Sequence, residues 1–195
     1  MSNALVEKDT VVLSVLCEEP EGDIVRHVRP MELSMENLKK FWSLAKDYKT
    51  LFTEEIRGDF GKFVNQMMKQ TDSGSLEATG LYWVVDDFVG VFYMTDITMQ
   101  GDQLLDALVH YTFLDGRHRG RLNLVKELLK FAFTKYGYIR LTTRVALYAT
   151  RHTFIFVEKI GFKKEGRIRR AVLKEGEYFD VNAYGILKDE VLDVD

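Results

Sequence analysis

The chain contains very little cysteine and very little proline. Cys17 is its one cysteine, and two prolines stand among its 195 residues. A single cysteine forms no disulfide within the chain and no multi-cysteine metal site, and this usage is typical of a reducing, cytoplasmic setting. We expect Cys17 to serve as a small apolar residue within a strand.

The sequence also lacks long apolar runs and a marked excess of either charge. No uninterrupted apolar stretch approaches the roughly 18 residues of a membrane-spanning helix, and the amino terminus has no apolar signal core. The formal net charge is -3 and the sequence pI is near 5.9. A dedicated nucleic-acid binder usually carries a strongly basic face. We therefore expect neither a membrane nor a nucleic acid as partner.

What the chain has in abundance is core-forming material. Hydrophobic residues make up 46% of it and aromatic residues 12%, which is enough for one sizeable core. No internal repeat, low-complexity tract or Pro/Ser-rich linker divides the sequence. We predict a single domain over residues 1–195.

Hydrophobic periodicity predicts an order of two strands, two helices, three strands, a helix, a strand, a helix and two strands. The strand segments are rich in aromatic and β-branched residues, whereas the helical segments carry apolar residues at three- and four-residue steps. The predicted strands are 11–16, 24–29, 81–85, 89–97, 107–114, 140–147, 162–173 and 177–186. The predicted helices are 35–45, 56–68, 121–135 and 151–160, with a loop at 71–80 and a tail at 188–195 that we expect to fray. This order indicates a mixed α/β (α+β) domain.

The turn at 115–120, where a predicted strand passes into a predicted helix, is the most informative segment. Unpaired N–H groups at a helix start carry partial positive charge and suit a phosphate. Gly120 lets the backbone approach such a ligand, and Arg117, Arg119 and Arg121 add donors suited to a pyrophosphate. The glycine spacing is neither that of a P-loop nor that of a dinucleotide fingerprint. A solvated basic turn is the alternative interpretation.

Two motifs resemble those of a known superfamily. Arg117-His-Arg-Gly-Arg-Leu122 is similar to the Arg/Gln-x-x-Gly-x-Gly/Ala signature of the GNAT acetyltransferases. Downstream, Glu158-Lys-Ile-Gly-Phe162 is similar to their Glu-Lys-x-Gly-Phe segment. The resemblance is best over 107–187, where 165–170 and 176–180 look closest to the branch of ribosomal-protein N-terminal and spermidine acetyltransferases.

The resemblance implies a fold and an activity. The fold is a single GNAT-like domain, with a mixed, mostly antiparallel sheet of about seven strands flanked by four helices. The activity is acetyl-CoA-dependent transfer of an acetyl group to a primary amine, directly, within a ternary complex. The amine would belong to a protein N-terminus, a polyamine or a small molecule, and a homo-oligomer is compatible with this assignment.

The same resemblance assigns a coenzyme A site. Main-chain groups around Phe113 and Leu114 would pair with the pantetheine arm where two strands splay apart, and such donors also polarise a thioester carbonyl. Thr150 and Thr153 take the places of the superfamily's frequent Asn and Ser. The pyrophosphate would lie against the turn formed by Arg117, His118, Arg119, Gly120, Arg121 and Leu122.

The sequence departs from the superfamily pattern at several of these positions. Leu122 stands where a Gly or Ala lets the cofactor meet the backbone, and Thr150 replaces the Asn. Val157 stands where many members have a tyrosine that protonates the thiolate, so the acid would be water or Tyr148. A catalytically weak acyl-CoA-binding or regulatory module on the same fold is therefore the alternative function. A nucleic-acid-associated protein is a third hypothesis, and the acidic net charge counts against it.

His110 is the favoured catalytic base, because imidazole titrates near neutrality and the residue lies in the strand entering the turn. Tyr111, on the opposite strand face, is the second candidate. The alternatives are a histidine packed within the strand and a core or rim tyrosine. A water held by Asp106 or Glu55 would also serve as base. The four histidines lack ligand-like spacing, so no metal site is predicted.

Five acidic residues bear on the choice of acceptor. They are candidates for an acidic approach to a cationic amine, although a hairpin tip and a solvated helix start explain them as well: Asp86, Asp87, Asp96, Glu54 and Glu55. The basic stretch at 163–170 would face an acidic partner or form a solvated strand edge.

Overall fold

The computed structural model describes residues 13–19, 22–48, 56, 58–114 and 119–192. Its strands are β1 (Leu13–Cys17), β2 (Ile24–Pro30), β3 (Met68–Gln70), β4 (Leu76–Ala78), β5 (Leu81–Val85), β6 (Gly90–Gln100), β7 (Gln103–Phe113), β8 (Arg140–Ala146), β9 (Lys163–Lys174) and β10 (Glu177–Leu187). Its helices are α1 (Met35–Ala45), α2 (Phe60–Met67), α3 (Arg121–Tyr136), α4 (Arg151–Ile160) and α5 (Asp189–Leu192).

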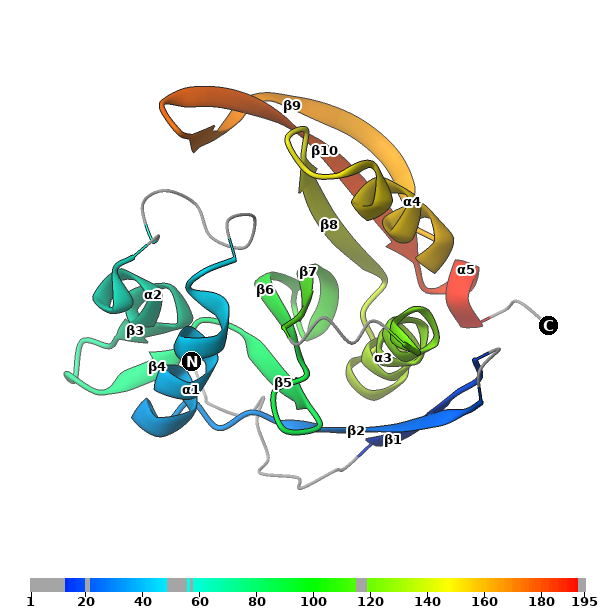
Figure 1. Ribbon diagram of the computed structural model, residues 1–195, viewed down its shortest axis with the longest axis horizontal. Coiled ribbons are helices and arrows are strands. Elements are labelled where there is room, and N and C mark those ends of the chain that lie inside the picture. The colour runs from blue at the N-terminus through cyan, green and yellow to red at the C-terminus, as the bar shows by residue number, and fades with distance from the viewer. Residues whose placement is uncertain (1–12, 20–21, 49–55, 57, 115–118, 193–195) are drawn as a thin grey trace.

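The large sheet confirms the predicted fold class. Its strand order is β1-β2-β5-β6-β7-β8-β10-β9, and every neighbouring pair is antiparallel except β7 and β8. The sheet has eight strands rather than about seven, because both strands of the amino-terminal hairpin join it. In Figure 1, β8, β10 and β9 curve away from β6 and β7 as a separate wing.

Two predictions were wrong around the second helix. The helix begins at Phe60, where the Asp59 side chain accepts a hydrogen bond from the Lys62 N–H, and it ends at Met67. Met68 then starts β3, which pairs with β4 inside the segment predicted to be a loop. These strands have three residues each, which is too short for an apolar alternation to be recognised, so periodicity did not reveal them.

A fifth helix, α5, follows β10 within the stretch that was expected to fray. Glu190 accepts a hydrogen bond from the Leu187 N–H, and the Lys188 N–H donates to the Ile139 carbonyl. Val191 packs against the main core. These contacts hold the last described turn in place.

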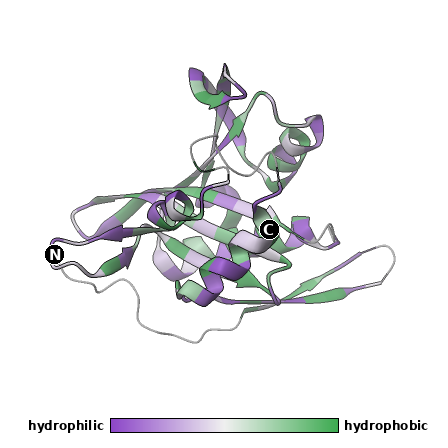
Figure 2. Ribbon diagram, turned by 60° about the vertical axis from the view of Figure 1, so that its left-hand side comes forward, coloured by the Kyte–Doolittle hydropathy of each residue, from purple (hydrophilic) through white to green (hydrophobic). Residues whose placement is uncertain are grey.

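The sheet separates two hydrophobic clusters. α1 and α2 cover one face with residues such as Phe41 and Phe63, whereas α3 and α4 cover the other with residues such as Leu128 and Ile160. Figure 1 shows these pairs of helices on opposite sides of β5, β6 and β7. Figure 2 shows apolar and polar residues interleaved along the strands, as expected for a sheet packed in this way.

Two smaller observations concern the sequence predictions directly. Cys17 is fully buried in β1, as expected, and its thiol lies 3.8 Å from the Val15 carbonyl oxygen. Among the helices of the described residues, none combines the length and the apolar character required to cross a bilayer.

Candidate active site

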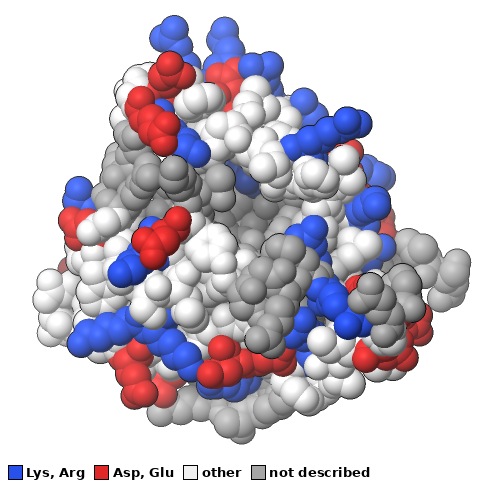
Figure 3. All heavy atoms as spheres, in the orientation of Figure 1, with Lys and Arg blue, Asp and Glu red and all other residues white. Residues whose placement is uncertain are grey.

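The central feature of the sheet is the place where β7 and β8 part. The two strands pair in parallel only at Leu108 and Thr142. The next residue of β8, Thr143, is buried and donates from its hydroxyl to the Val109 carbonyl at 3.0 Å. Beyond this contact the strands enclose a cavity of about 1050 Å³ instead of a ladder. Figure 3 shows the molecule hollowed near the middle of this face, with both basic and acidic side chains around the hollow.

The direction of the main-chain groups along β7 can be read from two contacts. The Val109 carbonyl points toward β8, whereas the Leu114 N–H points toward β6 and donates to the Val89 carbonyl at 2.8 Å. Because alternate residues of a strand direct their main-chain groups to opposite edges, those of Tyr111 and Phe113 face the gap. The Leu114 carbonyl also accepts a hydrogen bond from the Tyr48 hydroxyl. This placement favours Phe113 and argues against Leu114 as a main-chain partner of pantetheine.

The cavity has walls on both faces of the sheet. On the α1–α2 face, the ring of His110 stacks on Tyr93, with centroids 4.4 Å apart and planes inclined by 8°. On the α3–α4 face, Tyr111 meets Phe156 edge to face at 5.5 Å. The guanidinium of Arg121 lies 4.8 Å from the Phe156 ring centroid. His110 and Tyr111 are adjacent in β7, so their side chains point to opposite faces of the sheet. The cavity that both residues line therefore opens on both faces.

His110 is half-buried and is held in its neutral form. Burial lowers the pKa of His110 from its ordinary 6.5 to about 4; the Asp96 carboxylate opposes this shift and the Arg144 guanidinium adds to it. Its Nε2 lies 3.1 Å from the Thr95 hydroxyl. A neutral imidazole can accept a proton, and its conjugate acid would pass that proton on readily.

Tyr111 is less suited to act as a base. Burial raises the pKa of its phenol well above the ordinary 10.0, and Arg121 only partly offsets this. The phenol therefore keeps its proton at neutral pH. Tyr148 also lines the cavity, and burial raises its pKa as well. Its ring packs against Phe179 and beneath the Lys174 ammonium, 4.0 Å from the ring centroid.

The described part of the basic turn faces the β1–β2 hairpin. A Cβ added at Gly120 would lie 2.5 Å from the Cys17 Cβ, so the open side of this glycine is filled by β1. The Gly120 N–H donates to the Glu19 carboxylate at 2.5 Å. The sequence interpretation of Gly120 is thus corrected: its missing side chain makes room for Cys17, because the turn packs on the hairpin. Arg117 and His118 lie outside the described residues.

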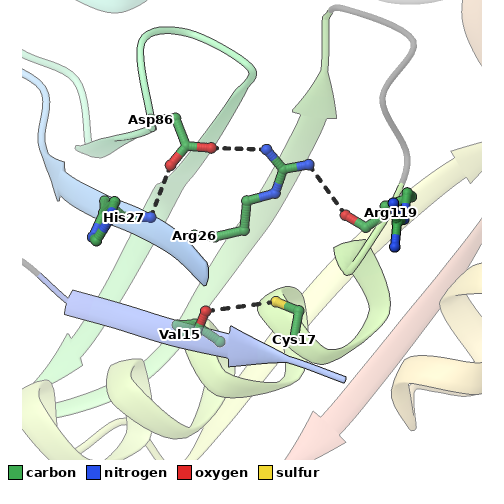
Figure 4. Close-up of polar contacts among 6 residues, drawn as sticks. All are labelled: Val15, Cys17, Arg26, His27, Asp86 and Arg119. Atoms are coloured by element: carbon green, nitrogen blue, oxygen red, sulfur yellow. Dashed lines mark hydrogen bonds and ion pairs between the residues drawn. The ribbon is translucent and has the colours of Figure 1, made fainter. Parts of the chain in front are cut away.

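Arg119 belongs to the same packing arrangement. Its guanidinium donates to the Gly22 carbonyl at 2.8 Å, and its own carbonyl accepts a hydrogen bond from Arg26 at 3.3 Å. Arg26 in turn pairs with Asp86 at 2.8 Å (Figure 4). Arg119 therefore connects the turn to the β1–β2 hairpin.

The remaining predicted cofactor residues divide into two groups. Arg121, Thr150 and Thr153 line the cavity, and the two threonine hydroxyl oxygens lie 3.3 Å apart at the start of α4. Thr150 is the N-cap of α4, but its side chain makes no capping hydrogen bond. Leu122 is half-buried and packs against the main core instead. Leu122 is not among the residues that line the cavity.

The acidic candidates mostly have structural partners. Asp106 lies on the side of the Leu108–Thr142 pairing that is away from the cavity. Burial raises the pKa of Asp106, and Arg140 opposes that shift. Asp86 pairs with Arg26 and accepts from the His27 N–H, whereas Asp87 pairs with Lys40. Glu54 and Glu55 lie outside the described residues. In the basic stretch, Lys163 pairs with Glu190 and Arg167 with Asp180.

Sequence reasoning missed several residues that line the cavity. Tyr48, Tyr93, Arg144 and Phe156 come from four different elements or segments and carry no motif. A weak signal existed for Arg144, since it interrupts a β-rich strand two residues after Thr142. No group of three metal-ligating side chains occurs within the described part of the chain.

Comparisons with known proteins agree with this geometry. A family profile described as an acetyltransferase (GNAT) domain matches residues 42–183. No curated protein matches the chain in sequence. Among solved structures, the fold is similar to a chimera of spermidine N-acetyltransferase SpeG from Vibrio cholerae and hSSAT. The TM-score is 0.68 and the identity 18%, over 86% of this chain and 98% of that one.

Two further structures extend the comparison. The dodecameric spermidine N-acetyltransferase from Vibrio cholerae gives a TM-score of 0.64 at 17% identity, over 86% of this chain and 96% of that one. A ribosomal-protein alanine acetyltransferase from Vibrio fischeri gives 0.63 at 14%, over 91% and 98%. At these identities the likeness concerns the fold. Because the family profile spans most of the sequence and contains both motifs, the chain belongs to the GNAT family of N-acetyltransferases.

Proposed function

We propose that this protein transfers the acetyl group of acetyl-CoA to a primary amine by direct attack while both are bound. The observation that carries the proposal is the cavity between β7 and β8, which has walls on both faces of the sheet. A donor on the α3–α4 face and an acceptor on the α1–α2 face would meet where the strands part. Holding the two in one place supplies much of the rate enhancement in such transfers.

The residues on the α3–α4 face suit coenzyme A. Arg121 offers charged donors for a phosphate, and the Thr150 and Thr153 hydroxyls can donate or accept. The first turn of α3 adds N–H groups that have no partner within the helix. The Gly120 N–H already holds the Glu19 carboxylate. Phosphates would therefore use Arg121 and the helix amides, or displace Glu19.

The chemistry assigns one role to each group at the gap. Acetyl-CoA supplies a thioester when bound. The Tyr111 or Phe113 N–H polarises its carbonyl, because these groups face the gap. His110 accepts the proton that the amine loses as its nitrogen bonds to the carbonyl carbon. Tyr148, protonated at neutral pH, donates to the sulfur as the carbon–sulfur bond breaks.

A catalytically weak acyl-CoA-binding module is the second candidate. Two observations favour it. Val157 is 1% exposed, and its side chain has no ionisable proton to donate at the position where the superfamily often has a tyrosine. The Glu19 carboxylate also accepts a hydrogen bond from the Gly120 N–H, which is an amide of the proposed phosphate site. Binding without turnover would distinguish this candidate from the enzyme.

The test begins with calorimetry of acetyl-CoA binding, followed by a free-thiol release assay over a panel of amines. Thr150→Ala should weaken acetyl-CoA binding about tenfold or less, as expected for loss of one hydrogen bond. Ser34→Ala is the matched control, because Ser34 caps α1 through the Asn37 N–H at 3.3 Å. It should lower stability by about 1 kcal/mol and leave acetyl-CoA binding unchanged. No binding at millimolar acetyl-CoA would rule out both candidates.

The proposal extends to location and assembly. A cytoplasmic site of action is supported by the buried free thiol of Cys17, whose pKa is raised by burial. A homo-oligomer is supported by the similar structure described as dodecameric. Light scattering after size-exclusion chromatography would give the oligomeric state.

A further inference from the structure

Arg144 occupies a distinctive position in the cavity. The parallel register of Leu108 with Thr142 places Arg144 level with His110, and strand alternation directs both side chains to the α1–α2 face. Both residues line the cavity. The effect of the guanidinium on the His110 pKa also requires the two groups to be close. Arg144 therefore lies on the proposed acceptor side, beside the proposed base.

The Arg144 guanidinium has no hydrogen-bond or ion-pair partner among the described residues. Three other sheet arginines have carboxylate partners: Arg26 with Asp86, Arg140 with Glu165 and Arg167 with Asp180. A guanidinium presents a planar fork of donors that matches a carboxylate in bidentate geometry. Arg144 is an exposed residue, and its unpaired fork on the cavity wall is accessible to an anionic group of a ligand.

The rest of the described wall agrees with this reading. Its charged or titratable basic groups are Arg121, Arg144, His110 and His152, and it contains no Asp or Glu. Asp96 influences His110 from an irregular part of β6, where it is exposed and does not line the cavity. On the acceptor side a polycation would meet the Arg144 guanidinium on the wall itself, whereas the Asp96 carboxylate, which affects the His110 pKa more than Arg144 does, lies off the wall. Direct contact with this wall is therefore unfavourable for a polycation.

We propose that the acceptor is an amine with a carboxylate a few bonds from its nitrogen, and that Arg144 binds that carboxylate. Paired strands lie about 4.8 Å apart, and β7 and β8 have begun to part at the level of His110 and Arg144, so these residues are separated by at least that spacing and can contact two groups of one small molecule. Apolar residues such as Ile168 and Val172, together with Tyr93, would contact its body. The acceptor class is then amino acids and related zwitterions. This inference rests on the proposed acetyl transfer.

The experiment compares amines that differ only in the carboxylate. Phenylalanine is paired with phenethylamine and leucine with isopentylamine, with spermidine as a polycation, all at saturating acetyl-CoA. We expect kcat/KM to be at least about tenfold higher for the carboxylated member of each pair, as for one charged hydrogen-bonded contact. Equal or reversed values, or spermidine as the best substrate, would overturn the inference.

Two arginine variants locate the effect. Arg144→Gln should abolish the preference for the carboxylated amines, with the KM for acetyl-CoA kept within about twofold, and Arg144→Lys should restore part of the preference. Arg121→Gln is the matched control on the opposite face, and it should raise the KM for acetyl-CoA while keeping the preference. If Arg144→Gln instead raises only the KM for acetyl-CoA, Arg144 belongs to the cofactor site and the inference fails.

Calorimetry separates this inference from the proposed function. If no amine is acetylated, the catalytic proposal fails, and phenylalanine and phenethylamine are titrated into protein with and without coenzyme A. Binding of phenylalanine alone, lost in Arg144→Gln, supports the carboxylate site. Binding of neither compound, or of both equally, overturns it.

Discussion

At the scale of single residues, the surroundings of His110 have opposing effects on the pKa of its imidazole. Burial against Tyr93 and the guanidinium of Arg144 disfavour the imidazolium, whereas the Asp96 carboxylate favours it. Burial is the larger effect. The imidazole is consequently neutral at the pH where an acetyltransfer base must accept a proton.

The lowered pKa of His110 predicts a loss of stability in acid. The folded pKa of about 4 lies below the ordinary 6.5, so the unfolded chain binds the proton first as the pH falls. Stability attributable to His110 is present above pH 6.5 and is lost between 6.5 and 4, by about 2 kcal/mol from pH 7 to pH 5. Urea unfolding of the wild type and His110→Gln at both pH values measures the difference.

The variant should lose less stability than the wild type on acidification. His152→Gln, at an exposed position of α4, is the control and should follow the wild type. Equal pH dependence in the wild type and His110→Gln would contradict a lowered pKa in the folded state.

Gly120 and Gly137 provide a matched pair at the two ends of α3. Both have positive φ, 71° and 75°, but an added Cβ at Gly137 meets nothing within 4 Å whereas one at Gly120 meets Cys17 at 2.5 Å. Gly137→Ala should cost about 1 kcal/mol from backbone strain alone. Gly120→Ala should cost about 3 kcal/mol or more, because β1 must also move. Chemical denaturation compares them, and similar losses would show that the turn does not pack on Cys17.

At the scale of elements, the parting of β7 and β8 is what turns a sheet into a site. Parallel pairing stops after Leu108 and Thr142, and the Thr143 side chain supplies the next contact in place of a main-chain bond. β8 is then paired with β10, so it follows the wing formed with β9 and β10. The unpaired main-chain groups of β7 are thereby left available to a ligand.

Thr143→Val should weaken both the fold and the donor site. The Val109 carbonyl would lose its hydroxyl partner at 3.0 Å, at a cost of about 1–2 kcal/mol. Because this contact lies at the start of the gap, we expect a few-fold higher KM for acetyl-CoA. Thr142→Val is the control: its hydroxyl lies 3.3 Å from the Ala107 carbonyl, outside the cavity, and its KM should be unchanged. Equal KM values in all three proteins would refute the link.

At the scale of the whole molecule, Arg26 connects parts of the chain that are far apart in sequence. It is 5% exposed, pairs with Asp86 at the β5–β6 turn and donates to the Arg119 carbonyl just before α3. The amino-terminal hairpin, the central sheet and the start of α3 are thus joined through one side chain (Figure 4).

Asp86→Asn should therefore destabilise the fold substantially. It removes the charge but keeps a residue type that tolerates the positive φ of 48°. The buried Arg26 would lose its counter-ion, at about 2–3 kcal/mol, below the range for fully buried pairs because the Asp86 side chain is 24% exposed. Asp87→Asn, which breaks an exposed pair with Lys40, should cost about 0.5 kcal/mol or less. Thermal unfolding of both variants tests this ordering, and equal losses would contradict it.

Much of the fold was predictable because its causes are local. Side-chain periodicity placed every strand of the large sheet and the four main helices within a few residues. The family, which the profile match over residues 42–183 confirms, followed from two short motifs at 117–122 and 158–162. The short strands β3 and β4 were missed because three residues are too few to give a periodic signal.

The sequence by itself therefore determined the order of the main elements, the strand-to-helix turn and the family. Only the tertiary structure decided which residues from distant parts of the chain lie next to one another. Glu19 and Gly120 are 101 residues apart in the chain, and no local pattern predicts that a carboxylate would meet that amide. The same holds for the unpaired Arg144 beside His110, since strand register and the parting of the sheet bring them together. Periodicity depends on neighbours in sequence, whereas charge pairing and cavities depend on neighbours in space.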